Sequence, residues 1–324
     1  MATEPLERTV AGISAASQKI LEKLGEFIVG NRHLMELVLI ALFSEGHILI
    51  EGVPGTAKTI LAKSMASITG SSFNRIQGAI DLQPADIIGV RIYEMEKRDF
   101  TLRRGPVFAN ILLVDEINRI NPKSQSAFIE AMSERQATID GTTLPLPHPF
   151  FAMATQNPYE FEGTFPLIEA QRDRFMFSLT SRHLGPAEEL EIVRKVHGGT
   201  LDWETYAAGL TPLLDSGSIA ACIGTANRIR VEEPVLQYIR NLVMASRDHA
   251  DVDLGASSRA SIALVRGGKG MAMLRGRTFV IPDDIREIAP AVFRHRLILS
   301  SEAEIEGLTP EDVARGILGS VEVL

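Results

Sequence analysis

The chain has 324 residues, of which 45% are hydrophobic, and a net charge of −8 with its histidines neutral. This length and composition predict two domains with sizeable cores. The negative charge disfavours broad adhesion to nucleic acid, and the single cysteine, Cys222, excludes an internal disulfide. The N-terminus lacks a signal-peptide pattern, and no run of about 18 apolar residues predicts a membrane span. We therefore expect a cytoplasmic protein.

Apolar residues recur at helical spacing in two N-terminal segments, residues 7–29 and 31–44. Short apolar runs typical of buried parallel strands follow at residues 47–51, 111–114, 150–155 and 175–179. A helix is predicted after the first run, closing at Gly70, and another between the second and third runs, with Asn121 as its N-cap. Strands that alternate with helices predict an α/β domain with a mainly parallel sheet.

Strand signals fade after about residue 184. Helices are predicted in the remainder of the chain at residues 187–198, 231–247, 258–276 and 282–297. We therefore expect an α/β core over residues 1–184 and a smaller all-helical domain over residues 185–324, which is a typical domain size.

A glycine-containing loop follows the first predicted strand. Its sequence, GVPGTAKT at residues 52–59, nearly fits the phosphate-binding pattern G-x-x-x-x-G-K-[ST], but Ala57 stands where the pattern has glycine. In such a loop, backbone N–H groups converge on phosphate oxygens at a helix N-terminus. Lys58 would reach the β- and γ-phosphates of a nucleotide, and the Thr59 hydroxyl would ligate Mg²⁺. The alternative is an ordinary strand-to-helix turn with an incidental lysine.

The loop predicts both a set of ligand contacts and a backbone conformation. Its expected nucleotide-binding residues are Gly52, Val53, Pro54, Gly55, Thr56, Ala57, Lys58, Thr59 and Ile60. At Ala57 we expect right-handed helical dihedral angles, which cost alanine nothing. We also expect near-normal nucleotide affinity after Ala57→Gly.

Polar residues follow the next two predicted strands. Asp115 and Glu116 end the strand at residues 111–114, where two adjacent carboxylates cost desolvation unless a cation such as Mg²⁺ lies nearby. Asp115 would hold Mg²⁺ through water, and Glu116 would deprotonate the attacking water. Asn157, beyond the following strand, would hydrogen-bond the γ-phosphate or that water. The alternatives are a solvent-facing acidic strand end and an Asn157–Pro158 turn.

Taken together, these motifs resemble the MoxR family of AAA+ ATPases. The resemblance includes NPKSQSAFIEAMSERQATIDG and ATQNPYEFEGTFPLIEAQRDRFMF, and then GASSRASIAL and AMLRGRTFVIPDDIREIAPAVFRHRL, which look like the family's lid. It spans about Glu26 to Leu299, with the motifs in the family's order. It implies an AAA+ P-loop core with a parallel sheet, a smaller all-helical lid, and hydrolysis of ATP with Mg²⁺.

The resemblance also implies roles for individual residues. Asn157 matches the sensor 1 residue, and Arg259 matches sensor 2 on the lid. Arg174 matches the arginine finger, which AAA+ rings offer to the γ-phosphate of the neighbouring subunit. Val29 and Gly30 fall where the adenine pocket begins.

Two other interpretations of this arginine remain. Arg174 would form a surface ion pair with Asp173, or Arg172, two positions earlier, would be the finger instead. We favour Arg174, because Arg172 lies outside the motif match. An arginine supplied by a neighbour would make hydrolysis depend on assembly.

Two segments resemble insertions of the branch that contains MoxR, magnesium chelatase and minichromosome-maintenance proteins. Residues 76–90 fall where an insertion interrupts the second core helix. Residues 136–147 independently predict a β-hairpin with a tight turn at Asp140–Gly141. The resemblance implies hairpins near a ring pore that transmit nucleotide state to a substrate; the alternative is that they only pack on a neighbouring subunit.

The resemblance implies a homo-hexameric, chaperone-like ATPase whose partner is a von Willebrand factor A domain protein on a separate chain. This chain's own DSGS at residues 215–218 has the wrong spacing for that domain's metal-binding motif. One alternative is a nucleic-acid motor that uses Arg98, Arg103 and Arg104, although acidic residues interleave with them and no nucleic-acid-binding domain is evident. The other is the ATPase subunit of a metal chelatase.

Overall fold

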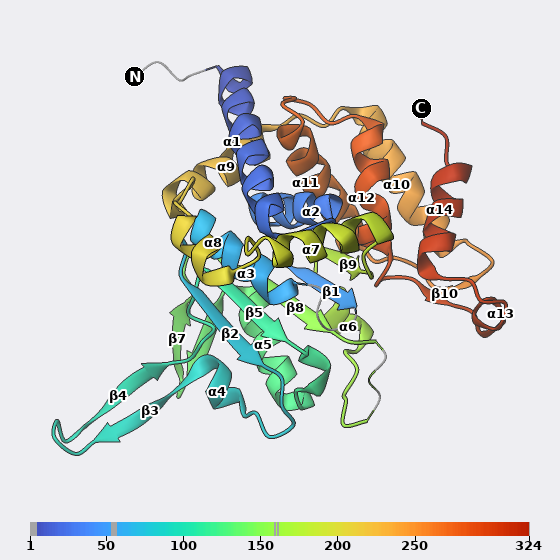
Figure 1. The fold of residues 1–324 in the computed structure, drawn as a ribbon. Coiled ribbons are helices and arrows are strands. Elements are labelled where there is room, and N and C mark those ends of the chain that lie inside the picture. Colours follow the sequence, from blue (N-terminus) through green and yellow to red (C-terminus); the bar gives the residue numbers. More distant parts are fainter. Residues whose placement is uncertain (1–4, 53–56, 159, 161, 324) are drawn as a thin grey trace.

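A computed structural model describes residues 5–52, 57–158, 160 and 162–323, and a five-stranded parallel sheet lies at the centre of its N-terminal half (Figure 1). In spatial order the strands are β2 (Phe73–Gln77), β5 (Ile111–Asp115), β8 (Phe151–Gln156), β1 (Ile48–Gly52) and β9 (Phe177–Ser181). The expected α/β fold with a parallel sheet is confirmed. Four of these strands were predicted, although β9 begins two residues beyond the predicted start at residue 175.

Strand β2 was missed because it lies at the edge of the sheet. Only Ile76 of its five residues is buried, so its sequence, FNRIQ, has no apolar run. The central strand β5 differs, since it is covered on both faces. Its alternate residues enter two separate cores, with Leu113 in one and Leu112 and Val114 in the other.

The predicted helices of this half are present as α1 (Leu6–Phe27), α2 (Arg32–Phe43), α3 (Lys58–Ile68) and α5 (Pro122–Glu134). Asn121 caps α5 as predicted, because its side-chain oxygen accepts a hydrogen bond of 3.1 Å from the backbone N–H of Ser124. Three short elements were not predicted: α4 (Pro84–Ile88), the 3-10 helix η1 (Ile117–Arg119) and α6 (Glu169–Arg172).

Two β-hairpins extend from this domain. The hairpin of β6 (Gln136–Ile139) and β7 (Thr142–Pro145) confirms the prediction, with Asp140 and Gly141 at φ angles of 47° and 76° in the turn. The hairpin of β3 (Gly89–Glu94) and β4 (Asp99–Arg104) projects far from the body (Figure 1). The predicted insertion at residues 76–90 holds only the approach to it, which includes α4 and the first residues of β3.

The C-terminal part consists mainly of helices, grouped to one side of the sheet (Figure 1). They are α7 (Pro186–His197), α8 (Trp203–Gly209), α9 (Ser216–Arg228), α10 (Glu233–Arg247), α11 (Ser258–Leu274), α12 (Pro282–Phe293), α13 (Ser301–Ile305) and α14 (Pro310–Ser320). The expectation of an all-helical part needs one correction, since β10 (Val252–Leu254) pairs with β11 (Ile298–Leu299) in an antiparallel ladder.

Helix α11 packs against both α1 and α2, so a single apolar core joins the two ends of the chain. Cys222 lies in that core, and burial raises the pKa of its thiol to about 11. None of the helices in the described residues is both long and apolar enough to cross a membrane.

Candidate nucleotide site

A cavity of about 660 Å³ lies where β1, β5 and β8 end, which is where ligands bind in doubly wound sheets. We call it the strand-end cavity. Its lining includes nine of the predicted site residues, namely Val29, Gly52, Ala57, Lys58, Thr59, Ile60, Asp115, Glu116 and Asn157. Gly30 lines a neighbouring hollow instead, and Val53, Pro54, Gly55 and Thr56 lie outside the described residues.

One wall of the cavity was not expected from the sequence. Arg182, His183 and Leu184 follow β9, and Ile192 of α7 lies beside them. Their only sequence signal is that Arg182 and His183 lie a few residues after the predicted strand at residues 175–179. Phe27 and Val29, which precede the glycine-containing loop in the sequence, line the same cavity.

Phe27 connects this wall to an aromatic cluster outside it. Its ring lies 5.8 Å from that of Trp203 and 4.8 Å from that of Tyr206, both on α8. The hydroxyl of Tyr206 donates a 2.8 Å hydrogen bond to the carbonyl of Lys23 on α1. The cluster therefore fixes α8 against the last turns of α1, behind the cavity wall.

Lys58 begins α3, and its ammonium lies inside the site. Nζ donates a 2.7 Å hydrogen bond to the carbonyl of Gly52 at the end of β1. Burial lowers the pKa of Lys58, while the carboxylates of Asp115 and Glu116 oppose that shift. These surroundings leave a cation in a partly desolvated pocket, where an anionic ligand is attracted strongly.

Thr155, which sequence reasoning missed, contacts both acidic residues: the carboxylate of Asp115 and the backbone of Glu116. The buried Thr155 hydroxyl donates to Oδ1 of Asp115 at 2.6 Å and accepts a 3.0 Å hydrogen bond from the backbone N–H of Glu116. The Thr59 hydroxyl lies 3.4 Å from Oδ2 of the same Asp115 carboxylate. Glu116 has left-handed backbone angles, with φ at 55°, so the chain turns sharply between the two acids.

Side chains of the edge strand β2 also reach the carboxylates. The Arg75 guanidinium lies 2.7 Å from Oδ2 of Asp115, and Gln77 donates a 2.9 Å hydrogen bond from Nε2 to Glu116. Arg75 and Gln77 are also hydrogen-bonded to each other. Because β2 itself was not predicted, neither contact could be foreseen.

The backbone at Ala57 contradicts the prediction. Its φ and ψ are 58° and 17°, which is left-handed rather than right-handed helical. The helix begins at Lys58, and Ala57 is the capping residue before it, so Ala57 lies outside the helix whose angles were predicted for it. A left-handed backbone is costly for alanine and easy for glycine, so the glycine of the usual pattern would fit here without strain.

Comparison with known proteins agrees with this geometry. A family model for AAA, the ATPase family associated with various cellular activities, matches residues 47–177, and one for the AAA lid domain matches residues 244–317. Chaperone MoxR1 of Mycobacterium tuberculosis is 40% identical over 318 residues, covering 94% of this chain and 81% of that protein. The chain belongs to the MoxR family of AAA+ ATPases.

Other relatives of this MoxR-family ATPase differ in how similar their sequences are to it. YeaC of Bacillus subtilis, described as uncharacterized, is 41% identical over 305 residues and 94% of each chain. The crystal structure of a candidate ATPase from Cytophaga hutchinsonii matches with a TM-score of 0.90 and 37% identity over 98% of each chain. Magnesium-chelatase subunits are more distant, and the 38 kDa subunit of Acidiphilium rubrum is 26% identical over 238 residues.

The two predicted arginines of this MoxR-family protein lie outside the strand-end cavity. Arg174 and Arg259 line a second cavity of about 340 Å³, together with Arg296. The Asp173 carboxylate is engaged by Arg296 at 2.8 Å and by Arg259 at 3.5 Å, so the considered ion pair between Asp173 and Arg174 is not formed. Within the described residues, no hydrogen bond or ion pair holds the Arg174 side chain.

The rival Arg172 has a different environment. Its Nη2 lies 3.4 Å from Oε1 of Glu169, one turn earlier on α6. It lines neither the strand-end cavity nor the second cavity.

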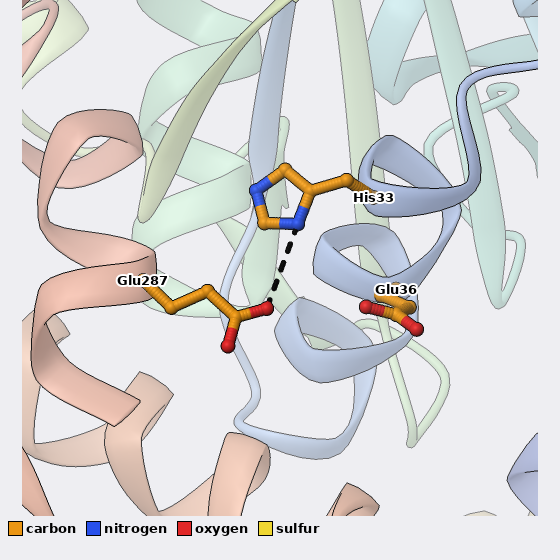
Figure 2. A group of neighbouring side chains, drawn as sticks. All are labelled: His33, Glu36 and Glu287. Atoms are coloured by element: carbon orange, nitrogen blue, oxygen red, sulfur yellow. Dashed lines mark ion pairs between the residues drawn. The ribbon is translucent and has the colours of Figure 1, made fainter. Parts of the chain in front are cut away.

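A separate cluster joins the N-terminal helices of the MoxR-family fold to its lid. Figure 2 shows His33 and Glu36 on α2 beside Glu287 on α12, with an ion pair drawn between His33 and Glu287. One side-chain nitrogen or oxygen from each of the three residues lies within 4.8 Å of the others. Arg275 lies 3.2 Å from Glu36 and 2.9 Å from Glu287, and Arg32 lies 3.6 Å from Glu36. Since arginines already neutralise these carboxylates, the cluster is an ion network that ties α2 to α11 and α12.

Proposed function

We propose that this MoxR-family ATPase binds ATP with Mg²⁺ in the strand-end cavity, and that hydrolysis drives the remodelling or activation of partner proteins. The observation that supports the site is the convergence of Lys58, Thr59, Asp115 and Glu116 on one cavity at the strand ends. The remodelling role is supported by the relative named Chaperone MoxR1.

The donor set fits a magnesium–nucleotide. Thr59 and Asp115 offer a hydroxyl and a carboxylate oxygen 3.4 Å apart, which are the hard oxygen ligands that Mg²⁺ prefers. When bound, Mg²⁺ would neutralise charge on the phosphates. Lys58 would exchange its bond to the Gly52 carbonyl for the β- and γ-phosphates.

Two side chains would act on the attacking water. Glu116 would orient the water and accept its proton, since its carboxylate lies at the end of β5 on the wall of the cavity. Asn157, beyond the end of the neighbouring strand β8, would hold the water or the γ-phosphate by a hydrogen bond from its amide. Val29, Leu184 and Ile192 would take the base of the nucleotide.

The positions of Arg174 and Arg259 support the proposal that the enzyme is an oligomer. Both line the second cavity rather than the strand-end cavity, and the Arg174 side chain forms no ion pair within the described residues. We therefore assign them to the nucleotide of an adjacent subunit, where Arg174 would stabilise charge on the transferred phosphoryl group. The assembly is proposed to be a homo-hexameric ring.

The proposed partner is a von Willebrand factor A domain protein on a separate chain. The projecting β3–β4 hairpin is a candidate contact, because Tyr93 and Phe100 form an exposed pair of rings 5.3 Å apart. Nucleic acid is a weaker candidate, because the overall charge is −8 and the hairpin pairs Glu94 with Asp99 near its tip. A chelatase role is disfavoured by the lower identity of those relatives.

The catalytic assignment is tested with two variants. Lys58→Ala should weaken ATP binding, whereas Glu116→Gln should bind ATP with near-normal affinity and hydrolyse it slowly. Affinity is measured with a fluorescent ATP analogue, and turnover by release of phosphate. Normal turnover by the Glu116→Gln protein would contradict its assignment as the base.

The trans role of Arg174 is tested by mixing subunits. Arg174→Ala and Glu116→Gln subunits are each impaired, but a mixed ring contains sites with an intact Glu116 and a neighbour's intact Arg174. Activity should therefore recover on mixing, after chromatography has shown that mixed rings form. Absence of recovery in such rings would count against this geometry. A pull-down with the Glu116→Gln protein and ATP then identifies the partner.

A further inference from the structure

The segment that bears Arg174 is held by a residue from the other end of the chain. Arg296 follows α12, next to β11, and only 2% of its side chain is exposed. Its guanidinium nevertheless reaches across to residues 173–176, between α6 and β9. A lid residue thus lies inside the core loop that carries the proposed finger.

All five N–H groups of this guanidinium are used. Nε donates to Oδ1 of Asp173 at 2.8 Å, and the two terminal nitrogens donate to four backbone carbonyls, at distances from 2.6 to 3.1 Å. Those carbonyls belong to Asp173, Phe175, Met176 and Val292. Four of the five bonds therefore go to the loop, and they fix the backbone on both sides of Arg174.

The energetic cost of burying the Arg296 guanidinium favours a fixed backbone at residues 173–176. A charged guanidinium is costly to bury unless each donor is satisfied, and burial lowers the pKa of Arg296, while Asp173 opposes that shift. The partners are mostly carbonyls of the main chain, so the bonds specify the path of the backbone rather than a side-chain rotamer. The Arg174 side chain, in contrast, is held by no hydrogen bond or ion pair within the described residues.

We propose that Arg296 is a positioning residue for Arg174, which it aims at the neighbouring subunit by holding residues 173–176 to the lid. This inference rests on the proposed function of Arg174. It implies that the lid of a subunit sets the geometry of the arginine which that subunit offers to its neighbour. Lysine cannot replace Arg296, because its ammonium is a point donor with three N–H groups and cannot span carbonyls on both sides of Arg174.

The test is a double-mutant cycle on the full-length assembled protein, with kcat and KM for ATP as readouts. Arg296→Lys should lower kcat about tenfold or more, because a small misplacement of a catalytic group is costly, and should leave KM within about twofold. If Arg296 acts through Arg174, then adding Arg296→Lys to Arg174→Ala should not lower kcat further. Arg286→Lys is the control, because among the described residues the Arg286 side chain donates only to the carbonyl of Leu318, within the lid.

Each outcome decides between the two proposals. Multiplied losses in the double variant, or a normal kcat for Arg296→Lys beside an impaired Arg174→Ala, overturn the positioning role but leave the finger in place. A normal kcat for Arg174→Ala overturns the finger and the positioning role together. If Arg296→Lys does not fold, as judged by thermal unfolding, Asp173→Asn takes its place in the cycle, since Asp173 accepts the Nε bond.

Discussion

Thr155 holds the carboxylate of Asp115 from the neighbouring strand, with its hydroxyl 2.6 Å from Oδ1, and the same hydroxyl accepts the backbone N–H of Glu116 at 3.0 Å. Thr155→Val keeps the shape but removes both bonds. Because such supporting contacts orient metal ligands, we expect kcat for ATP to fall about 10- to 100-fold. Thr155→Ser restores the hydroxyl and should return most of the activity.

The readout that separates this effect from misfolding is nucleotide affinity without Mg²⁺, which Thr155→Val should leave within about twofold of the wild-type value. A valine variant with wild-type kcat, or a serine variant as impaired as valine, would show that the hydroxyl does not orient the acids.

The backbone angles of Ala57 predict an unusual response to glycine. Holding alanine at left-handed angles destabilises the folded protein by about 1–2 kcal/mol. Glycine removes this strain but stabilises the unfolded chain by about 0.4–1 kcal/mol, because it has more conformational freedom there. Ala57→Gly should therefore leave the free energy of unfolding unchanged or raise it by up to about 1.5 kcal/mol. Ala11→Gly, on the exposed face of α1, should lower it by about 1 kcal/mol. Urea denaturation of the nucleotide-free proteins measures both; equal losses would mean that Ala57 is not strained.

Arg75 and a metal ion would compete for the same oxygen. The guanidinium lies 2.7 Å from Oδ2 of Asp115, which also faces the Thr59 hydroxyl. The Arg75 side chain is 43% exposed, so the pair is worth at most about 1 kcal/mol. Arg75→Gln should tighten divalent-cation binding by up to about fivefold, while Arg75→Lys, which keeps the charge, should change it less.

Binding of Mn²⁺ in the presence of ADP, followed by electron paramagnetic resonance, measures this without relying on turnover. Weaker binding in the glutamine variant would instead mean that Arg75 supports the metal site.

Stability should fall in mild acid because His47 is buried in its neutral form. Its Nε2 lies 3.2 Å from the carbonyl of Met132, and its Nδ1 accepts a 3.1 Å bond from the N–H of Ala152. Burial, assisted by Arg135, lowers its pKa from 6.5 to about 4. As the pH falls, this histidine is therefore protonated in the unfolded chain before it is protonated in the folded one. The contribution of neutral His47 to the free energy of unfolding is fully present above pH 6.5 and is lost progressively towards pH 4.

The protonation of His47 lowers the free energy of unfolding by about 3 kcal/mol in total, and about 2 kcal/mol of this loss occurs between pH 6.5 and pH 5. His295 acts in the same direction, because burial places its pKa well below 6.5. His47→Gln should make the pH dependence of the unfolding free energy shallower, whereas His197→Gln, at an exposed position of α7, should not. Equal slopes for the two variants would contradict this origin.

The sequence predicted the centre of the sheet because central strands such as β5 are buried on both faces and read as apolar runs. It did not predict β2, whose residues are mostly exposed, and Arg75 and Gln77 were missed with it. An edge strand is stabilised mainly by pairing with its neighbour and needs no apolar run, so a single sequence seldom predicts it.

The site was predictable where its residues are close in sequence or end neighbouring strands, as Lys58 and Asp115 do. The angles at Ala57 were predicted wrongly, because the prediction placed Ala57 in the helix, whereas α3 begins one residue later, at Lys58. The position of Arg259 beside Asp173 depends on how the lid docks, and no local pattern encodes that contact.

Trp203 is the only tryptophan of the chain, and its ring lies 5.8 Å from Phe27, a lining residue of the strand-end cavity. Intrinsic tryptophan emission from this protein therefore arises at one known place, directly behind the proposed base pocket. The unlabelled enzyme thus carries its own optical probe, and a nucleotide that shifts Phe27 would be detected without attaching a dye.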